Sequence, residues 1–103
     1  MTALYQHVRQ KNATGIPYSE AVQLFLWAYC TRDILPPDLR SQTIDRQYLI
    51  DTFAQLATEH LITGLPEESR QNAAPRWAGL LDDLLANRIL LDPHFPARIG
   101  RYV

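Results

Sequence analysis

Apolar residues recur with the spacing of an α-helix in four stretches of this chain. In the clearest stretch, Trp77, Leu80 and Leu84 follow the spacing of a helix that turns one face to a core. Gly79 interrupts this stretch, and because glycine weakens a helix relative to alanine, it predicts close packing by a neighbouring helix. Glycine or proline also separates the four stretches. The pattern predicts helices near residues 2–11, 19–31, 43–63 and 75–88.

The end of the chain has a less regular pattern. Residues 88–91 can finish the last helix or begin a strand, and a turn-rich stretch follows at residues 92–96. Residues 97–103 alternate weakly between apolar and polar positions, as a short strand does. We therefore expect a mainly all-α fold, a compact bundle of about four helices, with a short C-terminal β-hairpin as one form of the tail. A length of 103 residues suits a single helical domain spanning residues 1–103.

The second predicted helix differs from the others because it is apolar on almost every side. Within residues 21–30, only one strongly polar side chain occurs. Successive residues of a helix turn by about 100°, so the aromatic side chains of this helix cannot all point into the core. We expect at least one of them at the surface, where Trp and Tyr often anchor protein interfaces. The candidate partner-binding residues are Gln23, Phe25, Trp27 and Tyr29.

Net charge, cysteine content and the length of the apolar stretches limit which partners and which cellular compartment we expect for this chain. The formal net charge is −1, so no overall basic field attracts nucleic acid. Cys30 is the only cysteine and cannot form an internal disulfide. No stretch has the apolar length of about 20 residues that crosses a bilayer, and the first residues lack a basic start followed by an apolar segment, so we expect no leader peptide. We therefore expect a reducing, cytoplasmic location and no membrane partner.

Groups that could carry catalysis or bind a metal are scattered along the chain. The soft or borderline metal ligands are His7, Cys30, His60 and His94. No two of them have the spacing of a zinc motif, and His60 is expected on the apolar stripe of its helix. The neighbouring carboxylates at residues 67–68 and 82–83 diverge by about 100° on a helix. The sequence predicts no enzyme, cofactor or metal site; a pocket lined by His60 and converging carboxylates would reverse this prediction.

A basic, aromatic tail is the one indication of nucleic-acid binding. Arg98, Arg101 and Tyr102 follow a leucine-rich helix and a turn that contains proline. In this order of elements, residues 77–103 resemble the end of a winged-helix domain, in which a helix is followed by a β-hairpin wing. The resemblance implies a DNA-binding transcription regulator that uses these three residues. Asp82 and Asp83 count against it, because they lie on the helix that should be basic.

The surplus apolar surface of the second helix favours a different hypothesis. We expect a small non-enzymatic interaction protein of a bacterial type, such as an adaptor, accessory subunit, immunity protein or inhibitor. It would bind a protein partner through an exposed apolar and aromatic helix surface. A second copy is the simplest partner, because a two-fold contact covers the same surface on both chains. Trp27 or Tyr29 would anchor such a homodimer, with Gln23 at its rim.

Overall fold

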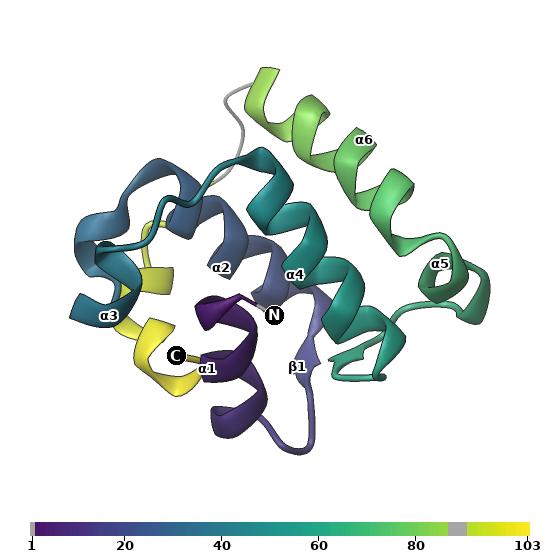
Figure 1. Ribbon diagram of the computed structural model, residues 1–103, viewed down its shortest axis with the longest axis horizontal. Helices are drawn as coiled ribbons and strands as arrows, with labels where there is room; N and C mark the ends of the chain where they lie inside the picture. Colours follow the sequence, from purple (N-terminus) through teal and green to yellow (C-terminus); the bar gives the residue numbers. More distant parts are fainter. Residues whose placement is uncertain (1, 87–90) are drawn as a thin grey trace.

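Helices make up most of the chain in the computed structural model, which describes residues 2–86 and 91–103 (Figure 1). The elements in chain order are α1 (Ala3–Lys11), β1 (Ile16–Pro17), α2 (Tyr18–Cys30), η1 (Arg32–Ile34), α3 (Pro37–Arg40), α4 (Arg46–Thr58), β2 (Ile62–Thr63), α5 (Glu67–Gln71), α6 (Ala73–Ala86), η2 (Phe95–Ala97) and η3 (Ile99–Arg101). The predicted all-α class is confirmed. The four predicted helices correspond to α1, α2, α4 and α6, and the short helices lie in the connections. No described helix is long and apolar enough to cross a membrane.

The third predicted helix is shorter than expected at both ends. α4 begins after Asp45, whose carboxylate accepts a hydrogen bond from the backbone N–H of Tyr48 and so caps the helix. It ends before His60, whose φ of 61° lies in the left-handed region. The backbone N–H of Leu61 then donates to the carbonyl of Leu56, which closes the helix in a Schellman arrangement. His60 is exposed, so the prediction that it lies on the apolar stripe is wrong.

A pair of very short parallel strands connects the start of α2 to the chain that leaves α4. Ile16 of β1 lies beside Ile62 of β2, and both side chains are fully buried. Gly15 precedes β1 with a φ of 104°. A side chain there would meet the methyl group of Thr63 at 2.8 Å, so glycine is required at this close approach. The strands hold the first turn of α2 against the end of α4.

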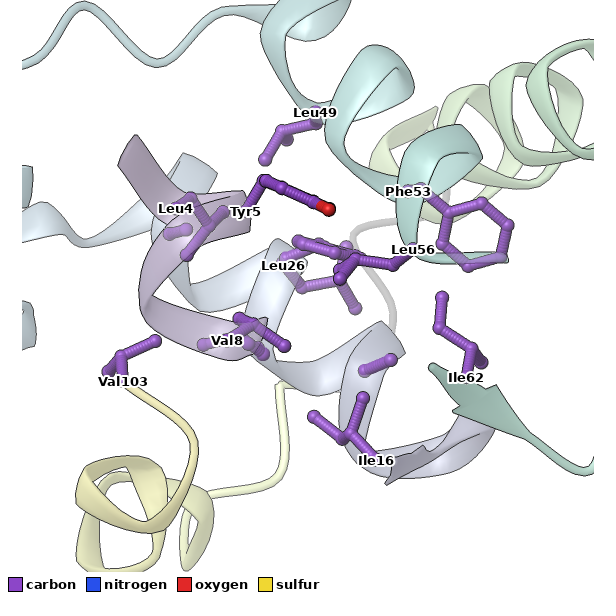
Figure 2. Packing of buried hydrophobic residues seen from close by; sticks show 14 of the residues in the cluster. Leu4, Tyr5, Val8, Ile16, Leu26, Leu49, Phe53, Leu56, Ile62 and Val103 are labelled. Carbon is purple, nitrogen blue, oxygen red and sulfur yellow. The ribbon is translucent and has the colours of Figure 1, made fainter. Parts of the chain in front are cut away.

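The buried residues form one hydrophobic cluster. Figure 2 shows side chains from α1, α2, α4, both strands and the C-terminal end meeting in this cluster. Val103, the last residue, is buried in it. Asn12 fixes the neighbouring backbone, because its side-chain Nδ2 donates to the carbonyl of Tyr102 at 3.1 Å. The two ends of the chain therefore pack together around α1.

α6 lies at the outside of the molecule and packs mainly along α4 (Figure 1). Trp77 and Leu81 are buried on its inner side. Arg46 of α4 donates through two nitrogens to the two carboxylate oxygens of Asp82, at 2.8 Å each. The predicted end of this helix, at residues 87–88, lies outside the described residues. The side of α6 that faces away from α4 is uncovered by the rest of the described chain, and Gly79 is exposed there.

The C-terminal tail folds as two 3₁₀ turns, so the alternative of a β-hairpin is wrong for residues 91–103. Proline at positions 93 and 96 lacks the N–H that strand pairing requires. Phe95 of η2 is fully buried and stacks on Tyr102, with ring centroids 6.0 Å apart. The tail is therefore a packed part of the fold. The predicted junction of helix and strand at residues 88–90 lies outside the described residues.

Candidate functional site

A cleft of about 280 Å³ lies between α2, α4, α5 and α6. Its lining residues are Tyr18, Phe53, Leu65, Ser69, Arg76, Trp77 and Leu80. They come from distant parts of the sequence, and the close approach of α2 to α4 at the paired strands brings them together. Apolar and aromatic side chains predominate, with two hydroxyl groups and one guanidinium as the polar groups.

An aromatic cluster forms the floor of this cleft. The rings of Phe53 and Trp77 are stacked, with centroids 4.6 Å apart and an interplanar angle of 11°. Phe25 meets both rings edge-on, at 6.0 Å and 5.6 Å. Tyr18 meets Phe53 edge-on at 6.4 Å, and burial raises the pKa of its phenol. The floor is therefore rigid and apolar, and Tyr18 remains neutral at ordinary pH.

The chemistry of the cleft suits binding better than bond breaking. Ser69 is the lining residue with an alcohol hydroxyl, and a serine hydroxyl is a weak nucleophile unless a base lies beside it. The described lining residues include no histidine and no carboxylate. His60 belongs to a different part of the surface, after α4. Within residues 2–86 and 91–103, no three His, Cys, Asp or Glu side chains gather as metal ligands.

The structure distributes the predicted partner-binding residues over different sides of α2. Phe25 is fully buried in the aromatic cluster, so its prediction as a surface residue is wrong. Tyr29 is 40% exposed. Trp27 is half-buried, and Gln23 accepts a hydrogen bond from the backbone N–H of Asp92 at 2.8 Å. Tyr29 is thus the exposed aromatic that the sequence led us to expect on this helix.

Two of the three predicted nucleic-acid-binding residues are engaged within the fold. Arg98 donates to both carboxylate oxygens of Glu20, at 3.1 Å and 3.2 Å, and to Asp92 at 2.8 Å. The hydroxyl of Tyr102 donates to Glu20 at 2.8 Å. We call these four residues the Glu20 clasp. Arg101 is exposed. DNA binding through all three would require the clasp to open, and it stays a prediction.

Sequence reasoning missed the two carboxylates of the Glu20 clasp. Glu20 lies in the first turn of α2, where a carboxylate is favourable without any other partner. The turn-rich composition around Asp92 gave no sign that the tail returns to α2. Arg98 lowers the pKa of both carboxyls through its hydrogen bonds, and the carboxylates raise the pKa of Arg98 in return. The clasp therefore links α2 to the tail by charge as well as packing.

We expect the clasp to make folding stability depend on acid pH. Both carboxyls have a folded pKa below their ordinary values of 4.5 and 3.8. Their stabilising contribution is complete above about pH 5 and is lost as the pH falls through the folded pKa values. Urea unfolding between about pH 3 and pH 7 measures it. The double variant Glu20→Gln and Asp92→Asn should show a flatter dependence. Equal losses in parent and variant would contradict this role.

The chain was also compared with known proteins. No protein-family model, no curated protein and no solved structure matched it. Its function is therefore inferred from the geometry and chemistry of its own residues.

Proposed function

We propose that this chain is a non-enzymatic protein-interaction module that holds an apolar side chain of a protein partner in the cleft. The observation that carries the proposal is the stacked pair of Phe53 and Trp77 beneath an opening of about 280 Å³. Protein interfaces concentrate their binding energy where large side chains enter well-packed, desolvated pockets. The cleft volume of about 280 Å³ lies just below the roughly 300 Å³ at which small-molecule pockets begin, and it suits one or two side chains.

The surface around the cleft extends the contact beyond one side chain. Tyr18 and Tyr29 are eleven residues apart in α2, about three helical turns, and so lie on the same side of that helix. Leu80 supplies a partly exposed apolar wall from α6. Arg76 adds one positive charge, which favours a partner with an acidic residue next to its apolar side chain. Gln23 and Trp27 lie on another side of α2 and are outside this surface.

The variant Leu80→Asp tests the proposal. It places a charge in the cleft wall at a position that is already partly exposed. Thr43→Asp is the matched control, because it adds the same charge in an exposed loop between α3 and α4. We expect the parent and Thr43→Asp to capture the same protein from the native extract, and Leu80→Asp to lose at least about ten-fold in yield.

The captured protein must then bind the purified chain directly. Titration calorimetry with the purified partner should give a dissociation constant that rises at least about ten-fold with Leu80→Asp and stays unchanged with Thr43→Asp. Equal binding by the parent and Leu80→Asp would show that the cleft is not the binding site. Circular dichroism of each variant confirms that the fold is retained.

A further inference from the structure

The polar groups that line the cleft have no partners among the described residues. The hydroxyls of Tyr18 and Ser69 make no hydrogen bond there, and the guanidinium of Arg76 makes no ion pair. These three residues belong to α2, α5 and α6. All three groups can donate hydrogen bonds, and the described lining includes no carboxylate that would accept them. The cleft therefore presents donors around an apolar floor, and a ligand that fits it must supply acceptors.

These donors favour a ligand with one negative charge. Arg76 adds a single positive charge to the lining, and its planar guanidinium matches the two oxygens of a carboxylate. Tyr18 keeps its proton at ordinary pH, because burial raises the pKa of its phenol, and so it can donate to an anion. A phosphate would bring close to two charges to one cation, and would leave the stacked rings of Phe53 and Trp77 uncovered. A carboxylate joined to an apolar group matches both parts of the cleft.

The size of the cleft restricts how a protein can present both groups. A volume of about 280 Å³ holds one or two side chains, so the carboxylate and the apolar group must lie close together. In an extended segment, neighbouring side chains point to opposite sides, so only one of them would enter the cleft. On a helix, neighbouring side chains diverge by about 100°, and those that share a side are a full turn apart. The last residue of a chain avoids this restriction, because its α-carboxylate and its side chain are joined to the same Cα.

We propose that the cleft binds the C-terminal residue of a partner protein, with an aromatic side chain on the floor of Phe53 and Trp77 and the α-carboxylate on Arg76. Ser69 and Tyr18 donate further hydrogen bonds to the carboxylate. An aromatic side chain suits this floor, since rings gain from stacked and edge-on contacts with one another. This C-terminal binding rests on the proposed function, because it specifies which part of the protein partner enters the cleft. The same aromatic residue inside a chain lacks the carboxylate and binds more weakly.

Three synthetic peptides, titrated into the full chain, test the role of the chain end. The first is acetyl-Gly-Ser-Gly-Ser-Phe with a free C-terminal carboxylate, the second is its C-terminal amide, and the third ends in alanine with a free carboxylate. We expect the first to bind with a dissociation constant on the order of 0.1–1 mM, and the other two at least about ten-fold more weakly. Two-dimensional NMR follows the indole N–H signals of Trp27 and Trp77. The signal of Trp77 should shift on binding, whereas that of Trp27, outside the cleft, should not.

The variant Arg76→Gln separates the carboxylate contact from the apolar contact. It should raise the dissociation constant of the free-acid peptide at least about ten-fold and leave that of the amide unchanged, because only the acid carries the charge. Arg40→Gln is the matched control, since it removes the same charge from an exposed position of α3 outside the cleft. Ser69→Ala and Tyr18→Phe each remove one donor, and each should raise the dissociation constant of the free acid about three- to ten-fold.

Four outcomes would overturn the C-terminal binding. The amide could bind as tightly as the free acid, or Arg76→Gln could weaken both peptides equally. The free-acid peptide could leave the Trp77 signal unshifted at about 10 mM. Phenylpropanoate, which carries the same ring and carboxylate without a peptide chain, could bind more tightly than the peptide, and the cleft would then take small carboxylic acids. The proposed function has its own test, because capture of a protein that is lost with Leu80→Asp does not require a free chain end.

Discussion

Replacing Trp77 by alanine is expected to lower the free energy of unfolding by about 3–5 kcal/mol. The side chain is 1% exposed and contacts the rings of Phe25 and Phe53 from α6. Alanine would remove the largest buried side chain of α6 and would leave a cavity beneath the cleft. Urea unfolding followed by far-ultraviolet circular dichroism measures the loss.

Two control variants test whether the loss of stability comes from the volume of the buried Trp77 side chain. The first tests the indole N–H group, and the second tests a tryptophan that is less buried. The indole Nε1 of Trp77 is buried and has no hydrogen-bond partner in the described chain, so Trp77→Phe should cost much less than Trp77→Ala. Trp27→Ala removes the other tryptophan, which is half-buried, and should also cost less. Equal losses for Trp27→Ala and Trp77→Ala would contradict the central position of Trp77. A folded Trp77→Ala protein should also bind its partner more weakly, because the cleft has lost its floor.

The sequence predicted the long helices because their apolar spacing records which side of each helix is buried. In α6, Trp77 and Leu81 follow this spacing and are both buried. The paired strands carry no such signal, since two residues cannot show a period of two. Ile16 and Ile62 pair across a large separation in sequence, and their contact depends on the arrangement of the helices around them. Short elements of this kind are set by tertiary packing.

The candidate site shows a different limit of sequence reasoning. A helix that is apolar on almost every side must leave something exposed, and Tyr29 is 40% exposed as this argument requires. The same argument cannot tell which side a neighbour covers, and Phe25 is therefore buried against expectation. The cleft combines Tyr18 with Leu80, which only the three-dimensional structure brings together. Gly79 predicted close packing by a neighbouring helix, but among the described residues no atom lies within 4 Å of a Cβ built there.

Replacing Phe95 by alanine is expected to release the C-terminal tail and to destabilise the fold by about 3–5 kcal/mol. Phe95 is fully buried and stacks on Tyr102 with an interplanar angle of 7°. The guanidinium of Arg98 lies 5.4 Å from the centre of the same ring, so the substitution also removes a cation–π contact. Arg98 and Tyr102 of the Glu20 clasp both pack on this ring, so its loss would also weaken the clasp.

The location of the tail determines how this loss would be observed. A terminal segment can detach before the remaining core unfolds, so both global stability and local opening must be measured. Urea unfolding gives the first, and the rate of digestion by a carboxypeptidase gives the second. Phe95→Ala should accelerate digestion of the tail at least about ten-fold, whereas the exposed control Arg101→Ala should leave the rate near that of the parent. Equal rates for the two variants would mean that Phe95 does not anchor the tail. Faster digestion without a change in global stability would mean that the tail covers a core that folds without it.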